Sequence, residues 1–305
     1  MISIIVPCKN EEQAIPLFYP VLIENLKNLN QDYELIIVDD GSTDKTVEVC
    51  MDLKKKDPNI KVISFSRNFG KEAGMLAGLK ESKGDYVAIM DADLQDPPAL
   101  LEEMYRYVTE EGYDSAATYR VDRKGEPPIR SFFARQFYRL INSMIDVEIV
   151  DGARDYRLMS RKMVDAIISL PEYNRFSKGI FSWVGFKTKY VEFENVERVA
   201  GETKWSFWKL FAYAIDGIVG FTTAPLRIAT YSGLTVSVFG FLYMLYIVIK
   251  ALTIGDPVAG YPSLIAIICL LGGIQLIVIG IMGEYIAKTY LESKRRPHYI
   301  IKEIK

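Results

Sequence analysis

Two long uncharged stretches near the C-terminus constrain this chain more than any other feature of its sequence. No charged residue occurs between Arg227 and Lys250, and none occurs between Asp256 and Glu284. Each stretch exceeds the about 20 residues that an α-helix needs to cross the hydrocarbon core of a bilayer. The residues between them include glycine and proline, which are typical of a turn. The sequence therefore predicts a transmembrane hairpin over 227–288, with helices at about 228–250 and 262–284.

Basic residues are distributed unevenly around this predicted hairpin. The connecting loop carries only Lys250, whereas the open side carries Arg227, Lys288, Lys294, Arg295 and Arg296. Loops rich in lysine and arginine stay on the cytoplasmic side of a membrane. We therefore expect a multi-pass protein of the cell membrane, with the N-terminal domain and the tail over 289–305 both in the cytoplasm.

The stretch before the hairpin, residues 204–226, places large apolar side chains at helical spacing. They are Trp205, Trp208, Phe211, Ile215 and Ile218. This pattern fits a helix in the core of a soluble domain or an amphipathic helix lying in the membrane interface. The neighbouring hairpin favours the interfacial helix.

Residues 1–203 have a different pattern, in which short apolar runs alternate with longer amphipathic segments. We expect strands at 2–6, 33–38, 61–65, 86–90 and 115–119, and helices near 14–29, 43–56, 70–82 and 98–111. A further helix is expected at 160–170 and a pair of strands at 179–197. This alternation is typical of an α/β domain with a mostly parallel sheet and helices on both faces.

Several classes of protein are excluded by what the sequence lacks. The only histidine is His298, so histidine-based zinc sites and a Ser-His-Asp triad are not expected. No strand is followed by a glycine-rich dinucleotide or P-loop motif. The three cysteines form no C-x-x-C pair, so no disulfide framework is expected. A net charge of −2 gives no basic surplus for nucleic acid.

Polar clusters follow three of the predicted strands, at the ends where parallel sheets bind their ligands. They occupy residues 7–11, 39–44 and 91–96. Asp91 and Asp93 are two residues apart, so they would point to the same side of an extended chain. With Gln95 they offer the oxygen ligands that Mg²⁺ or Mn²⁺ prefers. A polar turn without a metal is the plainer interpretation of the D-x-D pattern taken alone.

A basic segment rich in aromatic residues follows residue 119. Its arginines include Arg120, Arg123, Arg130 and Arg135, interleaved with Phe132, Phe133 and Phe137. Such a segment is either a solvated helix face or a surface that receives a phosphate beside a membrane.

Taken together, the motifs resemble those of family 2 glycosyltransferases. The motifs are Ile-Val-Pro-Cys-Lys-Asn-Glu at 5–11, Val-Asp-Asp-Gly-Ser-Thr-Asp at 38–44, Arg-Asn-Phe-Gly-Lys at 67–71, Met-Asp-Ala-Asp-Leu-Gln-Asp-Pro-Pro at 90–98 and Arg-Val-Ala-Gly-Glu-Thr-Lys at 198–204. They are more closely similar to those of polyprenyl-phosphate glycosyltransferases, the group that includes dolichyl-phosphate mannose synthase and the bactoprenol glucosyltransferases. The resemblance covers nearly the whole chain, the hairpin included.

The resemblance implies a GT-A catalytic domain over 1–203 and a UDP-sugar donor whose sugar is transferred with inversion. It implies donor-binding roles for Pro7, Asn10, Glu11, Asp39, Asp40, Asp91, Arg198 and Lys204. It places Mg²⁺ or Mn²⁺ on Asp91, Asp93 and Gln95. Asp155, Asp93 and Lys71 are the implied catalytic residues.

The implied acceptor is a polyprenyl (undecaprenyl) phosphate, bound through Arg120, Arg123, Arg130 and Arg135. A phosphate monoester is mostly dianionic at pH 7, so it needs little help from a general base. We therefore expect Asp155 to orient an arginine or the acceptor, although it stands where this family is often assigned its base.

Two other functions and several details stay open. A processive polysaccharide synthase would carry a Gln-x-x-Arg-Trp motif and more spanning helices, and neither is found here. A non-catalytic nucleotide-sugar scaffold would not need Asp93 or Asp155. Glucose is the sugar that the resemblance favours, with galactose, N-acetylglucosamine and modified pentoses as alternatives. Homo-oligomerisation and the surface or cell-wall polysaccharide served are not determined by the sequence.

Overall fold

The chain folds into two compact units. The computed structural model describes residues 1–120, 136, 139, 142–145, 149–150, 152–193, 215, 217–254 and 260–305. The first unit comprises Met1–Ala214 together with Arg295–Lys305, and the second comprises Ile215–Lys294. The chain therefore leaves the first unit, forms the second and returns to the first at its C-terminus.

The first unit is built on a mixed sheet whose described strands follow the order β7-β5-β6-β4-β1-β2-β3-β8. The strands are β1 Ile2–Cys8, β2 Tyr33–Asp39, β3 Ile60–Phe65, β4 Tyr86–Ile89, β5 Ser115–Arg120, β6 Ala153–Ser160, β7 Thr188–Phe193 and β8 Ile301–Ile304. β1 pairs in parallel with β2 and β4, and β2 with β3, as does β5 with β7. β6 is antiparallel to both its neighbours, and β8 is antiparallel to β3.

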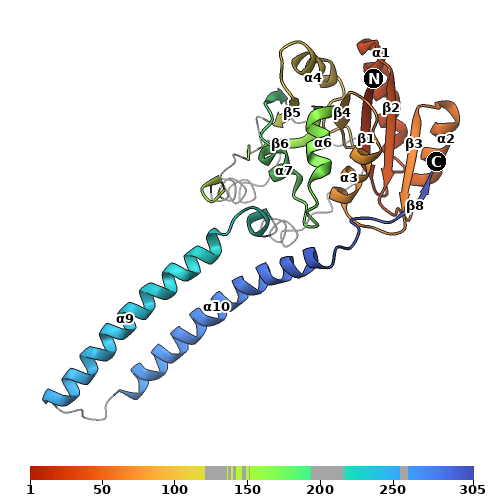
Figure 1. Cartoon of the computed structure of the whole chain (residues 1–305). Helices are drawn as coiled ribbons and strands as arrows, with labels where there is room; N and C mark the ends of the chain where they lie inside the picture. Colours follow the sequence, from red (N-terminus) through yellow and green to blue (C-terminus); the bar gives the residue numbers. More distant parts are fainter. Residues whose placement is uncertain are drawn as a thin grey trace. The chain divides into compact units, whose positions relative to one another are not determined.

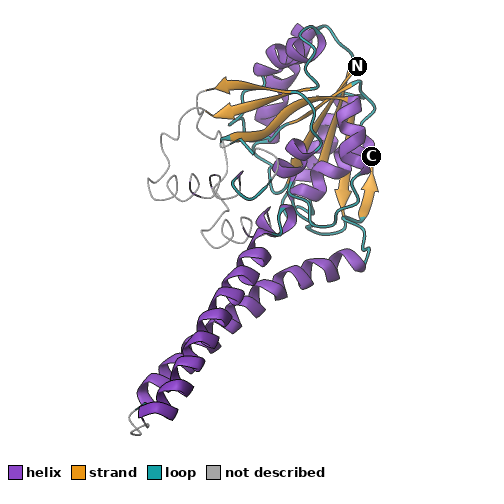
Figure 2. Cartoon of the chain, turned by 60° about the vertical axis from the view of Figure 1, so that its left-hand side comes forward, coloured by secondary structure: helices purple, strands orange, loops and turns teal. Residues whose placement is uncertain are grey.

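Helices cover both faces of this sheet (Figures 1 and 2). The helices of the first unit are α1 Ile15–Leu29, α2 Thr46–Lys56, α3 Lys71–Glu81, α4 Leu100–Thr109, α6 Arg161–Ser169 and α7 Ser177–Trp183. Apolar side chains of α1, α2 and α4 form one core cluster with β1 and its neighbours. α3, α6 and α7 pack on the sheet with buried residues outside that cluster, so they form the other layer.

α3 lies unusually close to the sheet because small residues face it. Every residue from Ala73 to Leu79 is buried. A side chain at Gly78 would collide with Ile5 of β1, and one at Gly74 would press on Pro7 at 3.1 Å. The close approach positions Lys71, the first residue of α3, above the carboxyl ends of the central strands.

The strand order reverses direction at β1. From β1 the chain continues outward through β2 and β3, whereas β4 lies on the opposite side of β1. Ligands of open α/β sheets bind at such a switch point, beyond the carboxyl ends of the strands. The polar clusters that follow β1 and β4 therefore flank the expected binding crevice.

Most elements that the sequence predicts for residues 1–120 are confirmed within a few residues of their expected bounds. Three elements differ. β6 and β8 were not anticipated, and 179–183 belongs to α7, so the strand-pair prediction for 179–197 is wrong there. Only β7 is a strand among the described residues of that range, and 194–197 lie outside the description.

The second unit contains two long helices, α9 Ala224–Ile254 and α10 Tyr261–Ser293, which run side by side as an antiparallel pair (Figure 1). The Tyr285 hydroxyl donates a hydrogen bond to the Thr222 carbonyl at 2.6 Å and so joins the open end of the pair. Large apolar side chains such as Phe239 and Leu276 remain exposed. Among the described residues, Leu270–Ser293 is one segment long and apolar enough to cross a membrane.

Candidate active site

The loops after β1 and β2 are joined by hydrogen bonds. Asn10, at a positive φ of 55°, donates its backbone N–H to Ser42 Oγ at 2.9 Å, and its own side-chain oxygen accepts from the Thr43 N–H at 2.9 Å. The Glu11 N–H donates to Thr46 Oγ1 at 2.8 Å. The predicted donor-binding residues Asn10 and Glu11 therefore belong to one preformed rim with the start of α2.

Asp39 and Asp40 are adjacent carboxylates whose partners differ. Asp39 Oδ1 accepts the Ser42 N–H at 3.1 Å, whereas the two oxygens of Asp40 accept the N–H groups of Phe69 at 2.6 Å and Gly70 at 2.9 Å. Burial raises the pKa of Asp40, and the two backbone hydrogen bonds oppose that rise. These separate donors explain how neighbouring buried carboxylates coexist, and Asp40 ties the loop after β3 to the rim.

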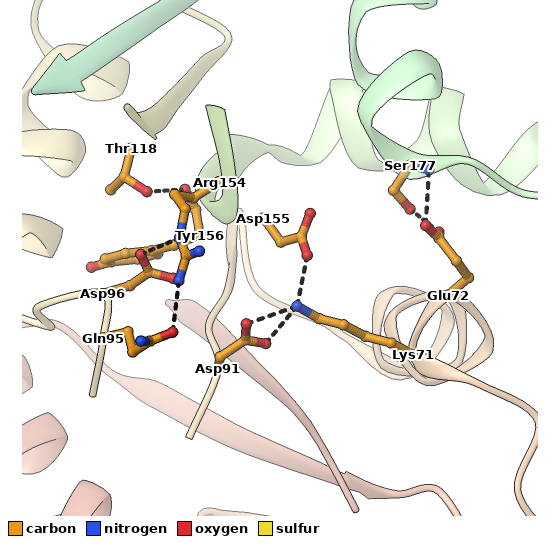
Figure 3. A network of polar contacts seen from close by, with 10 residues as sticks. All are labelled: Lys71, Glu72, Asp91, Gln95, Asp96, Thr118, Arg154, Asp155, Tyr156 and Ser177. Carbon is orange, nitrogen blue, oxygen red and sulfur yellow. Dashed lines mark hydrogen bonds and ion pairs between the residues drawn. The ribbon is translucent and has the colours of Figure 1, made fainter. Parts of the chain in front are cut away.

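Lys71 lies between two carboxylates at the carboxyl edge of the sheet (Figure 3). Its Nζ is 2.7 Å from Asp91 Oδ1 and 2.8 Å from Asp91 Oδ2, and it is 2.6 Å from Asp155 Oδ2. The three residues come from the start of α3, the loop after β4 and β6. The structure thus brings together three of the site residues predicted from the sequence.

The ion pairs within this cluster control its protonation. Burial alone would raise the pKa of Asp155, but the Lys71 ammonium, together with Lys178 and Arg154, holds that pKa well below its usual range. Burial alone would lower the pKa of Lys71, but Asp155 and Asp91 raise it above its usual value. Both groups are therefore charged at neutral pH.

A second cation, Arg154, contacts the far end of the loop that follows β4. Arg154 Nε donates to Asp96 Oδ1 at 2.9 Å, and Arg154 Nη2 lies 3.4 Å from the side-chain oxygen of Gln95 (Figure 3). Burial raises the pKa of Asp96 to about 6, against the influence of Arg154. Arg154 and Asp155 are consecutive in β6 and point to opposite faces, so one strand supplies both contacts.

The sequence led us to expect that Asp155 orients an arginine or the acceptor, and its hydrogen-bonded partner in the structure is Lys71. Arg154 binds Asp96, while Arg157 is buried, at 3 % exposure, with its guanidinium carbon 3.7 Å from the centroid of the Phe181 ring. Burial lowers the pKa of Arg157 to about 10. Had β6 been predicted as a strand, the alternation of its side chains would have placed Arg154 and Asp155 on opposite faces of the sheet.

Glu72 was not among the predicted site residues, although it adjoins Lys71. Its carboxylate accepts the Ser177 N–H at 3.1 Å and a hydrogen bond from the Ser177 hydroxyl, which joins α3 to the start of α7 (Figure 3). Burial, reinforced by the nearby Asp155 carboxylate, raises the pKa of Glu72 to about 7 against the Ser177 hydrogen bonds.

The chain supplies part of the set of ligands that a divalent ion needs. Asp91 already holds a cation with both oxygens, so a positive ion is accommodated there. Asp91 and Asp93 were expected to point to the same side of an extended strand, but Asp93 lies beyond the end of β4, so this expectation does not apply to it. Asp93 Oδ1 accepts a hydrogen bond from the Gln95 N–H at 3.2 Å. No group of three or more His, Cys, Asp or Glu among the described residues forms a metal site. The aspartates therefore fit a metal that takes its remaining ligands from substrate and water.

Five of the predicted site residues lie outside the described part of the chain. They are Arg123, Arg130, Arg135, Arg198 and Lys204. Arg120 ends β5, and Pro7 lies within β1, whose carboxyl end borders the expected binding crevice. Of the predicted interfacial helix at 204–226, residues 204–214 and 216 lie outside the described residues, and 224–226 belong to α9.

Comparison with known proteins matches both parts of the chain. A family model described as glycosyl transferase family 2 matches residues 3–168, and one described as GtrB C-terminal hairpin matches residues 224–289. The chain is 45% identical over 308 residues to a bactoprenol glucosyl transferase of Shigella phage SfV. It is 44% identical over 308 residues to a prophage bactoprenol glucosyl transferase homolog of Escherichia coli (strain K12). Each alignment covers 100% of this chain and 99% of the relative.

A solved structure shares the fold at low sequence identity. Mannosyl-3-phosphoglycerate synthase from Rubrobacter xylanophilus superposes with a TM-score of 0.52 at 17% identity, over 76% of this chain and 75% of that one. The expected GT-A arrangement of the sheet is confirmed.

Proposed function

The chain belongs to glycosyl transferase family 2, and from this premise we propose that it transfers glucose from UDP-glucose to a polyprenyl phosphate at the cytoplasmic face of a membrane. The observation that carries the proposal is the alignment of the whole chain, catalytic unit and hairpin alike, with relatives named bactoprenol glucosyl transferase. The chain is a glycosyltransferase, which excludes the alternative of a non-catalytic nucleotide-sugar scaffold.

The donor would occupy the crevice between the carboxyl ends of β1 and β4. The rim formed by Asn10, Glu11 and Asp39 offers hydrogen-bonding groups to a uridine, and Pro7 and Asp40 shape the backbone behind it. Asp91 and Asp93 would hold Mg²⁺ or Mn²⁺, which when bound stabilises negative charge on the departing nucleotide. Gln95, whose oxygen faces Arg154, would support the loop rather than serve as a ligand.

The acceptor would supply its own nucleophile. A phosphate monoester has its second pKa near 6, so a phosphate oxygen is already ionised at neutral pH. Attack by that oxygen on the sugar carbon, opposite the leaving diphosphate, inverts the configuration at that carbon. The residues of the chain therefore have to bring two anionic groups together, and Lys71 is a cation in direct contact with the proposed metal ligand Asp91.

Asp155 would position Lys71 and would not act as the general base. Its carboxylate is 2.6 Å from Lys71 Nζ, and its pKa is far too low for useful proton abstraction near neutral pH. The predicted basic residues at 120–135 and at 198 and 204 would complete the binding of the acceptor and donor phosphates.

Sugar transfer to lipid can be tested directly. The purified full chain in detergent is incubated with undecaprenyl phosphate and each of a panel of radiolabelled nucleotide sugars, and the lipid is then extracted. We expect label from UDP-glucose in the lipid phase, released as glucose by mild acid. Label from another sugar alone would correct the donor, and no lipid-bound label from any sugar would overturn the proposed function.

A further inference from the structure

The Lys71 ammonium occupies a position beside Asp91 that a divalent ion would also favour (Figure 3). Both oxygens of Asp91 face Nζ, at 2.7 and 2.8 Å. We propose that Lys71 holds the cation position of Asp91 in the metal-free enzyme, and yields it to the divalent ion only when the donor diphosphate is bound. The inference rests on the proposed function, because it takes the donor to be a nucleoside diphosphate sugar.

The two cations exclude each other at Asp91. A divalent ion binds carboxylate oxygens at roughly 2.1 Å. An ion on Asp91 would therefore lie within about 5 Å of the present Nζ position, where like charges repel strongly. Asp91 can accept the metal only after Lys71 has moved away from it.

The metal alone has little to offset the loss of this ion pair. Among the described residues no cluster of three carboxylate, histidine or cysteine ligands exists, and the Gln95 oxygen faces Arg154. Mg²⁺ in particular takes one or two carboxylates and relies on substrate phosphates for further ligands. The donor diphosphate supplies these oxygens and also gives the displaced ammonium a new anionic partner.

The backbone on both sides of Lys71 is anchored, so the exchange involves its side chain. The preceding residues, Phe69 and Gly70, donate their N–H groups to Asp40, and the next residue, Glu72, binds Ser177. Lysine carries its charge on a flexible four-carbon stem. Asp155 stays beside the ammonium at 2.6 Å and serves as the pivot about which Nζ swings from Asp91 toward the diphosphate.

The charges of the cluster also favour joint binding of the metal and the donor diphosphate. One lysine side chain lies between two aspartate side chains here, and the ordinary charges of these side chains sum to about −1. A divalent ion alone would make the cluster positive, and the donor diphosphate would restore its balance. Metal and donor should therefore bind cooperatively, each weakly without the other.

Mn²⁺ binding measured by electron paramagnetic resonance tests the exchange without measuring activity. The full chain in detergent is titrated with Mn²⁺ in the presence and absence of UDP. We expect at least ten-fold tighter binding with UDP in the wild type. Lys71→Met, which keeps the length of the side chain but not its charge, should bind Mn²⁺ at least ten-fold more tightly without UDP and show a smaller UDP effect.

Two further variants serve as the control and the substitute for Lys71→Met. Lys27→Met removes the same charge from an exposed site on α1 and should behave as the wild type. Lys71→Gln replaces Lys71→Met if the latter does not fold, as judged by its melting temperature. An unchanged Mn²⁺ affinity without UDP in the neutral Lys71 variant would overturn the exchange.

The titration also separates this inference from the proposed function. Equal Mn²⁺ binding with and without UDP in a wild type that glucosylates lipid would overturn the exchange alone. A wild type that binds no Mn²⁺ even with UDP would overturn both the metal site and the exchange. The lipid-labelling assay then decides independently whether sugar is transferred.

Discussion

At the scale of single residues, the cluster around Lys71 assigns different tasks to three aspartates. Asp91 and Asp155 share one ammonium group, while Asp93 lies in the turn that follows. Sequence reasoning identified all three aspartates and Lys71, but not which of them pair. The hydrogen bonds of Lys71 span 20 and 84 positions in the chain, so only the folded sheet brings the partners together.

Asp155→Asn tests whether Asp155 positions Lys71 or takes a proton. A positioning role predicts a higher acceptor KM and a fall in kcat of less than about ten-fold, because a general base usually contributes ~10²–10⁴-fold. The acid limb of the pH–rate profile should stay near pH ~6, where the acceptor phosphate titrates. Initial rates at saturating donor and metal measure both quantities.

The matched control for this variant is Asp165→Asn, which alters a side chain on α6 that is 63% exposed. It should leave both kinetic constants unchanged. A fall in kcat of two orders of magnitude with an unchanged acceptor KM would establish Asp155 as the base.

Asp93→Ala and metal removal test the divalent ion. EDTA should abolish transfer, and Mn²⁺ or Mg²⁺ should restore it, since a bound metal would stabilise charge on the leaving nucleotide. Asp93→Ala should lose on the order of 10²-fold in kcat, which is the typical cost of removing one such electrostatic contact. Asp52→Ala, on the surface of α2, serves as the control. Full activity of Asp93→Ala would rule out this ligand.

Glu72 makes stability depend on pH. Its pKa is about 7 in the folded chain, above the usual value of 4.5, so the folded state binds the proton more tightly than the unfolded state. This contribution to stability is present below pH ~4.5 and is lost as pH rises through ~7. Glu72→Gln mimics the protonated form, so it should gain about 1–3 kcal/mol relative to the wild type at pH 8.

Melting temperatures between pH 5 and 8 measure this effect. Glu24→Gln, at an exposed position of α1, should leave the pH dependence unchanged. Asp96, with a pKa of about 6, acts in the same direction, so some slope should persist in Glu72→Gln. If the melting temperature of Glu72→Gln changed with pH as steeply as that of the wild type, Glu72 would be ionised in the folded protein.

At the scale of whole elements, the central part of the sheet follows from hydrophobic patterning, whereas three elements do not. β6 carries Arg154, Asp155 and Arg157, which interrupt the apolar pattern of a buried strand because this strand serves the site. β8 is four residues long and contains Lys302 and Glu303. In α7, a short apolar run is compatible with either helix or strand, and local pattern cannot decide between them.

β8 extends the sheet beside the donor rim. The Tyr299 ring that precedes it stacks on Phe65 with centroids 5.0 Å apart, and Phe65 contacts Phe69, whose N–H binds Asp40. Tyr299→Ala should therefore destabilise the first unit by about 1–2 kcal/mol and raise the donor KM several-fold with little change in kcat.

The control for this contact is Ile300→Ala, since that neighbouring side chain is 53% exposed. Thermal unfolding and donor kinetics of the two variants provide the comparison. A Tyr299→Ala protein with an unchanged donor KM would show that the tail packs on the sheet without supporting the rim.

At the scale of the whole molecule, the return of the chain constrains its membrane topology. Residues 1–214 and 295–305 belong to the same unit, and β8 pairs with β3 within it. Both ends of the second unit therefore lie on one side of the proposed membrane, so this unit would cross it an even number of times, zero included. If α10 crosses, α9 must cross as well.

Cysteine labelling of intact cells tests this topology. In a chain with Cys269→Ala, a membrane-impermeant maleimide should label a cysteine placed at Gly260, between α9 and α10, but not one placed at Lys305. Cys8 and Cys50 are buried and give the background. Permeabilised cells should label both introduced positions. Labelling of Lys305 but not of Gly260 in intact cells would place the catalytic unit outside the cytoplasm, away from the proposed UDP-sugar donor. Protection of both positions would mean that the helix pair does not expose its turn, and the even count would then be zero crossings instead of two.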